Sequence, residues 1–182
     1  TLPEGELVAS SQSWNMHDRV PEQLDEVEAE RVIDPKPPVA EPDAFGVRAG
    51  SLASLPVLLN DHDPNEDVLT IDPTSVTGLD PGFGTVSITD DAQRLAVRVA
   101  PGATGSATFS YAVTDGTTEG GLVSDATTVT LTVVPDDVNT APQWCGVDNC
   151  LVPWPEPEVK RGGTITIPVL PGWVDPESDP LF

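Results

Sequence analysis

One stretch of this chain occurs twice, and its second copy lies 112 positions after the first. Residues 47–69 and 159–181 align over 23 positions without a gap, and nine of these positions carry the same residue. An interval of about 110 residues is the size of a small domain rather than one solenoid turn. The second copy stops at Phe182, early in its unit, so we expect a piece of a longer tandem array. Such arrays more often bind, space or adhere than catalyse.

From residue 44 onward, apolar and polar residues alternate in short runs that are separated by turn-forming residues. This period of two is typical of half-buried antiparallel strands, and six or seven such runs without a helix predict an all-β Greek-key sandwich. The residues expected to face the core are Leu55, Val57, Leu69, Ile71, Val86, Ile88, Leu95, Val97, Val99, Phe109, Tyr111, Val113, Val129, Leu131 and Val133.

The same patterns divide the chain into four segments. Residues 1–37 form an acidic, proline-rich N-terminal segment or linker, which could also end an upstream domain. Within it, residues 21–33 have helical spacing, and a short helix and an extended acidic linker both stay open. The sandwich is expected at 38–135, an interdomain linker at 136–142, and the start of a second repeat with a cysteine-containing insertion at 143–182, where a strand signal resumes at Thr164.

The composition is strongly acidic, with 30 Asp and Glu against 8 Lys and Arg and a net charge of -22. Such a surface repels nucleic acid and anionic membranes, so we expect no nucleic-acid partner. No apolar run of about 18 residues is present, which predicts no membrane span. The charge would attract divalent cations, although solubility alone is an equally good explanation.

The most acidic local motif is NDHDPNED at residues 60–67. Oxygen-bearing side chains recur at alternate positions, including Asp61, Asp63 and Asp67, and calcium takes six to eight oxygen ligands. The motif lacks the glycine and the closing glutamate of an EF-hand loop. A turn in which Asp and Asn side chains accept local amide hydrogen bonds is the alternative. The second copy offers only Asp175, Glu177 and Asp179 at the corresponding positions.

Three motifs in order carry a resemblance to a known family: PVLLNDHDPNEDVLTI at 56–71, FSYAVTDG at 109–116 and TTVTLTVV at 127–134. Together they resemble the bacterial Ig-like and cadherin-like (VCBS-type) repeats of large extracellular surface proteins. The resemblance implies an Ig-like β-sandwich, a location outside the cell or on its surface, and a role as stalk or adhesive module. In such sandwiches a tyrosine hydroxyl often ties a late strand to an earlier corner. Tyr111 is placed for this role, or is an ordinary core tyrosine.

The linker at 136–142 is similar to the calcium-holding linkers of cadherins, in which acidic and Asn residues precede a proline. This resemblance implies calcium as a cofactor that two domains share, which would stiffen their joint. A simple polar linker is the alternative. The candidate calcium ligands are Asp61, Asp63, Asp67, Asp136, Asp137 and Asn139.

Cys145 and Cys150 are separated by four residues, which matches neither a CxxC redox motif nor a zinc knuckle. We expect a local disulfide, with two reduced thiols as the alternative. Three tryptophans lie around this loop. They either pack the domain junction or form a recognition surface for a glycan or a cell-surface protein. They are Trp144, Trp154 and Trp173.

The sequence gives little support for catalysis. His17 and His62 are the two histidines, neither lies in a nucleophile motif, and no GxSxG motif is present. We therefore expect a non-catalytic stalk or spacer whose partners are neighbouring Ig-like repeats of the same chain. Two alternatives stay open: a carbohydrate- or protein-recognition module that uses the tryptophans, and an accessory domain of a large secreted hydrolase.

Overall fold

The computed structural model describes residues 34–181 except residues 90, 117–120 and 169. The acidic N-terminal segment predicted for 1–37, with its helical spacing at 21–33, therefore lies almost wholly outside the described residues. No helix in the described part is long and apolar enough to cross a membrane.

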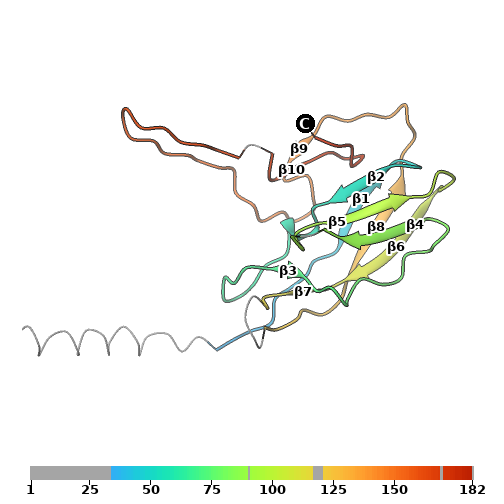
Figure 1. Ribbon diagram of the computed structural model, residues 1–182, viewed down its shortest axis with the longest axis horizontal. Coiled ribbons are helices and arrows are strands. Elements are labelled where there is room, and N and C mark those ends of the chain that lie inside the picture. Colours follow the sequence, from blue (N-terminus) through green and yellow to red (C-terminus); the bar gives the residue numbers. More distant parts are fainter. Residues whose placement is uncertain (1–33, 90, 117–120, 169, 182) are drawn as a thin grey trace, which may run out of the picture. The chain divides into compact units, whose positions relative to one another are not determined.

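Two three-stranded sheets form the body of the fold (Figure 1). The first sheet has the order β2 (Leu52–Leu55), β5 (Leu95–Val99) and β4 (Gly84–Ile88), and all its strands are antiparallel. The second has the order β1 (Asp43–Val47), β8 (Thr127–Val133) and β6 (Ser106–Tyr111). In this second sheet β1 is parallel to β8, and β6 is antiparallel to β8. A short 3-10 helix, η2 (Val57–Leu59), follows β2, and β3 (Thr70–Ile71) pairs with β7 (Val113–Thr114).

The alternating pattern decides which side chains enter the core. In β5, Leu95, Val97 and Val99 are at most 1% exposed, whereas Ala96 and Arg98 between them point outward. Fully burying one such aliphatic side chain contributes about 1.5–3 kcal/mol. Both sheets supply one apolar cluster, as expected for two packed layers. The predicted all-β sandwich is confirmed.

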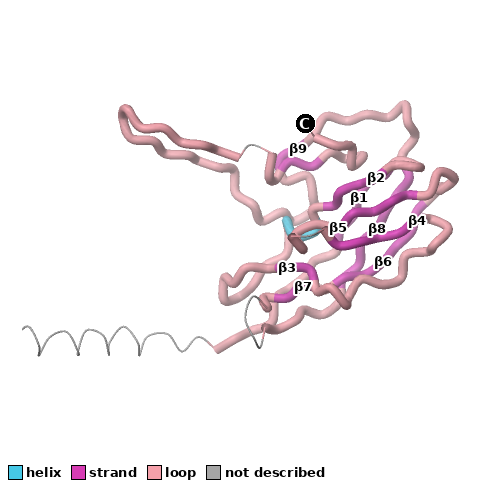
Figure 2. The backbone as a smooth tube through the Cα atoms, in the orientation of Figure 1, coloured by secondary structure: helices cyan, strands magenta, loops and turns pink. Residues whose placement is uncertain are grey.

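The second copy, taken from here on together with the insertion that precedes it (residues 143–181), has much less regular structure. Two short strands, β9 (Gln143–Trp144) and β10 (Trp173–Val174), pair antiparallel, and the chain between them runs out as a long loop (Figure 2). The strand expected from Thr164 is not present, and Ile165 is 45% exposed. The matching residues of the first copy pair with β5, and no described residue offers the second copy an equivalent strand. A strand without a ladder partner gains no inter-strand hydrogen bonds, which explains the wrong prediction.

Candidate functional site: the joint between the two copies

The second copy lies against the first sandwich, and we call this contact region the joint. On the Ig-domain side its members are β1, β2 and the β1–β2 turn. The other members are residues 135–140, which are the start of the linker with Pro135 before it, and residues 143–151 and 173–179 of the second copy. Val174 of β10 is 5% exposed and belongs to the apolar cluster of the first sandwich. Leu151 N–H donates to Leu59 O at 2.8 Å, which fixes the cysteine loop beside η2.

Gly46 of β1 makes the closest backbone approach in the joint. Its N–H donates to Pro176 O at 3.1 Å, on the side of β1 that is not paired with β8. A β-carbon at residue 46 would collide with this same carbonyl oxygen and crowd Val134. Glycine is therefore required here for close approach of the second copy.

Arg48 follows β1 and contacts both the linker and the second copy. Its Nε donates to Asp179 Oδ1 at 2.8 Å and its Nη2 to Asp179 Oδ2 at 2.7 Å, a bidentate pair. Nη1 also donates to Pro135 O at 3.0 Å, and Nη2 to Val138 O at 2.8 Å. The hydrogen bonds from Arg48 hold the pKa of the Asp179 carboxyl below its usual range. One side chain thus joins three separate segments.

Asp179 ends an acidic turn that also accepts hydrogen bonds from the linker. Asp175 Oδ1 accepts from the N–H groups of Glu177 and Asp179, at 3.0 and 3.1 Å. The Glu177 carboxylate accepts from Thr140 N–H at 2.9 Å and from Thr140 Oγ1 at 2.7 Å, and these bonds lower the pKa of Glu177. Within the described residues, the only group of three His, Cys, Asp or Glu ligands with donor atoms inside 4.8 Å is Asp175, Glu177 and Asp179.

A second polar cluster lies inside the first sandwich, around Tyr111. The Tyr111 hydroxyl lies 3.0 Å from Asp43 Oδ2, 2.9 Å from Asp61 Oδ2 and 3.0 Å from Val57 O. All four residues are buried. The tie expected for Tyr111 is therefore confirmed, because its hydroxyl joins the end of β6 to β1 and to the segment around η2.

This buried cluster holds too few protons for its oxygens. One phenol hydrogen can be donated to only one of these three oxygens, so a second hydrogen bond at this hydroxyl requires a proton on Asp43 or Asp61. Burial raises the pKa of Asp43 to about 7 and that of Asp61 to about 6. The hydrogen bond with the Tyr111 hydroxyl opposes the shift of Asp43, and the hydrogen bond from Glu41 N–H is the larger opposing effect on Asp61. Burial and both carboxylates also raise the pKa of Tyr111, which stays a hydrogen-bond donor.

The family follows from a match along the sandwich. The model of the bacterial Ig domain matches residues 35–134, more than half of the chain. The chain belongs to the bacterial Ig domain family. Its strands β1 to β8 all lie within the matched residues, whereas β9 and β10 follow them. A comparison with curated proteins gave no match.

Solved structures give only a loose likeness. A nucleoside hydrolase-related hypothetical protein from Saccharophagus degradans is 19% identical, with 55% of this chain and 26% of that chain covered and a TM-score of 0.39. The endo-fucoidan hydrolases MfFcnA9 and MfFcnA4_H294Q, from glycoside hydrolase family 107, are 23% and 26% identical. Here 53% and 59% of this chain and 15% and 16% of those chains are covered, with TM-scores of 0.36 and 0.34. The chain thus spans about a quarter or less of the length of these proteins.

The candidate calcium ligands of the Ig domain fall in different surroundings. Asp61 points into the core, where its Oδ2 accepts from Tyr111 and its Oδ1 from Glu41 N–H at 2.8 Å. Asp63 instead heads a surface turn, and its Oδ1 accepts from Asn65 N–H at 2.7 Å and Asp67 N–H at 3.2 Å. The structure does not bring these three aspartates into one ligand group among the described residues.

The linker candidates Asp136, Asp137 and Asn139 are exposed in the linker part of the joint. Asp136 is near enough to Arg48 to contribute to the raised pKa of the guanidinium, behind the larger effect of Asp179. Calcium binding at these residues stays a prediction. Sequence reasoning missed Gly46, Arg48 and Thr140 as joint residues. A basic residue follows the shared valine in both copies, at Arg48 and Lys160, and this was an available signal.

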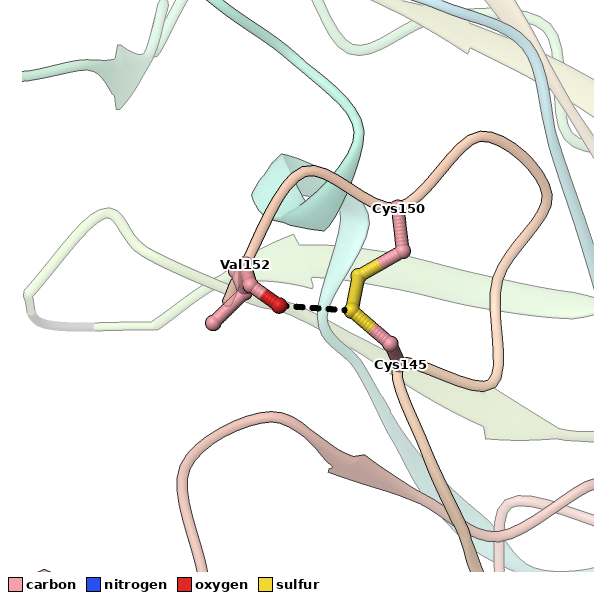
Figure 3. The surroundings of a disulfide bond; sticks show 3 residues. All are labelled: Cys145, Cys150 and Val152. Carbon is pink, nitrogen blue, oxygen red and sulfur yellow. Dashed lines mark hydrogen bonds between the residues drawn. A yellow bond between two sulfur atoms is a disulfide. The ribbon is translucent and has the colours of Figure 1, made fainter. Parts of the chain in front are cut away.

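The cysteine loop and the tryptophans lie next to the Ig domain at the joint. Cys145 and Cys150 form a disulfide with a Cα–Cα distance of 5.5 Å (Figure 3). Cys145 Sγ lies 3.1 Å from Val152 O, a close contact rather than donation, since a disulfide sulfur carries no hydrogen. The rings of Trp144, Trp154 and Trp173 meet edge to face, with centroids 4.8 to 6.2 Å apart.

The tryptophan cluster is only partly covered. Trp144 and Trp173 are half-buried, whereas Trp154 is 58% exposed. The Trp144 ring lies against Gly172, where a β-carbon would come within 2.6 Å of Cη2 and where φ is +88°. Gly172 is therefore needed both for its conformation and for its lack of a side chain.

Proposed function

We propose that this chain is a non-catalytic spacer of a tandem-repeat protein outside the cell or on its surface, in which the bacterial Ig domain sets the direction of the repeat that follows. Domains of this family are generally non-catalytic, and typically occur in extracellular proteins. The observation that carries the proposal is the joint, where Arg48 connects the Ig domain to the linker and to Asp179.

The contacts of the joint support a stiff connection rather than a flexible tether. Val174 buries its side chain in the Ig-domain core, so separating the copies would expose apolar surface. Separation would also break the Gly46–Pro176 and Leu151–Leu59 backbone bonds. Adjacent domains move freely by default, and only a packed interface of this kind holds them in one orientation.

Gly46→Ala tests this proposal, with Gly102→Ala as the matched control. A β-carbon at residue 46 would collide with Pro176 O, whereas one at residue 102 meets no atom within 4 Å. We expect amide hydrogen exchange at residues 173–179 to accelerate in Gly46→Ala and to stay unchanged in Gly102→Ala. Unchanged exchange in both variants would show that the second copy is not held against the Ig domain, and would overturn the spacer proposal.

Recognition of a glycan is the second candidate function, because one specific feature favours it. A cleft of about 300 Å³ lies between β2 and the second copy, and Leu52, Trp173, Asp175 and Asp179 are among the residues that line it. An aromatic face beside carboxylates is a combination that can bind a sugar. Calorimetric titration with neutral oligosaccharides tests this function, and Trp173→Ala should abolish any heat. A heat that persists in the variant would place the sugar elsewhere.

A further inference from the structure

We propose that Arg48 is the resident cation of the joint and takes the place that a divalent metal ion would otherwise have to fill. The proposal rests on the spacer function, because it concerns how the same joint is held. It follows that a side chain of the protein itself holds the joint in one orientation, and that this orientation does not depend on the calcium concentration.

The oxygens around the guanidinium are of the chemical types that a hard cation takes as ligands. Two are the linker carbonyls of Pro135 and Val138, and two belong to the Asp179 carboxylate. Carbonyl and carboxylate oxygens of this type also ligate calcium. Here all four accept hydrogen bonds from Arg48, at 2.7 to 3.0 Å.

The charge around this shell makes a cation necessary. Asp175, Glu177 and Asp179 present carboxylate oxygens within 4.8 Å of one another. Asp136 of the linker adds a further negative charge near the guanidinium. Without a positive group, these carboxylates would repel one another and drive the linker and the turn apart.

The geometry favours a guanidinium over a looser surface contact. Its planar fork holds Asp179 bidentately and has N–H groups left for both carbonyls, so one rigid group fixes two linker residues and the turn together. The Arg48 side chain is 15% exposed and that of Asp179 is 33% exposed, so the pair is partly shielded from screening by salt. An arginine is charged at every physiological pH, whereas a metal ion is present only when its concentration allows.

The test compares Arg48→Met with Arg98→Met, each as the full chain. Methionine keeps an unbranched apolar side chain and removes the charge; Arg98 is exposed on β5 and serves as control. Amide exchange at residues 173–179 is measured for each protein in millimolar calcium and in chelator. We expect wild-type protection to be equal in both buffers. In chelator, Arg48→Met should lose protection by about tenfold or more, as the loss of one charge-assisted hydrogen bond would give, and Arg98→Met should match wild type.

Two results would overturn the inference: wild-type protection that falls in chelator, or an Arg48→Met protein as protected as the control. The Gly46→Ala variant separates this failure from failure of the spacer proposal. If Gly46→Ala loses protection and Arg48→Met does not, the joint exists but Arg48 is not its resident cation. If neither variant loses protection, the joint itself is wrong.

Discussion

The raised pKa values of the buried Asp43 and Asp61 carboxyls beside Tyr111 predict that this Ig domain loses stability as the pH rises from about 4 to about 8. In the folded state burial raises the pKa of Asp43 from 3.8 to about 7, and that of Asp61 from 3.8 to about 6. The folded chain therefore binds more protons than the unfolded chain across this window. Its extra stability is fully present below the unfolded pKa values and is lost as the pH passes the folded values.

The magnitude follows from the size of the shift. Each pKa unit corresponds to about 1.4 kcal/mol, so the shift of Asp43 amounts to at most about 4 kcal/mol. Asp43→Asn removes this titration, keeps the size of the side chain and supplies an N–H donor in place of the O–H of the protonated carboxyl. Relative to wild type, we expect the variant to gain up to about 4 kcal/mol in free energy of unfolding between pH 4 and pH 8.

The assay is urea unfolding followed by far-UV circular dichroism at several pH values between 4 and 8. Asp125→Asn is the control, because Asp125 is exposed on the same domain. Its stability difference from wild type should stay constant with pH, whereas that of Asp43→Asn should grow. A constant difference for Asp43→Asn would mean that Asp43 is already ionised in the folded state, which would refute the proton count.

Three further predictions concern single contacts. Tyr111→Phe leaves the buried oxygens around it without their donor, and should lower the free energy of unfolding in urea by about 1–3 kcal/mol at pH 6. Gly172→Ala adds a clash with an indole ring to backbone strain, whereas Gly162→Ala adds strain alone at a φ of +79°, so tryptophan fluorescence should change far more in the first variant. The Cys145→Ser/Cys150→Ser variant should speed amide exchange around β9 and β10 by an amount equivalent to about 2 kcal/mol, and leave β5 unchanged. Equal fluorescence changes in the two glycine variants would contradict the second prediction, and equal changes in amide exchange in β5 and in β9 and β10 would contradict the third.

The sandwich could be predicted from the sequence because its strands carry a local signal. Every second residue is buried in β5 and, up to Leu131, in β8, and this alternation is visible without knowing the partner strand. The strand expected at Thr164 shows the limit of that signal, because strand formation also needs a neighbour that the pattern does not report. An alternation with a period of two indicates which face of a strand would be buried. It does not indicate whether a neighbouring strand is present to pair with it.

The candidate site was harder to predict because its contacts are distant in sequence. Arg48 meets Asp179 across 131 positions and Pro135 across 87. The aspartates of residues 61–67 show the opposite case, because neighbours in sequence were expected to form one calcium site and lie in different surroundings. They are close in sequence, yet Asp61 turns into the core beside Tyr111 while Asp63 and Asp67 build a surface turn. Positions two apart would share one face of an extended strand, but residues 63–67 form a turn, so the alternating pattern did not imply a shared site.

The repeated stretch acquires a physical meaning from these contacts. Asp63 and Asp175 occupy equivalent positions, and each accepts from the N–H groups two and four residues later.

The side chain two residues after each aspartate then accepts from a backbone N–H of the segment that precedes its copy. Asn65 Oδ1 accepts from Lys36 N–H at 2.7 Å, and Glu177 Oε2 accepts from Thr140 N–H at 2.9 Å. The same turn therefore holds the entering chain in both copies. The aspartates are shared because the turn needs them, and this need explains their recurrence whether or not a metal ion ever binds there.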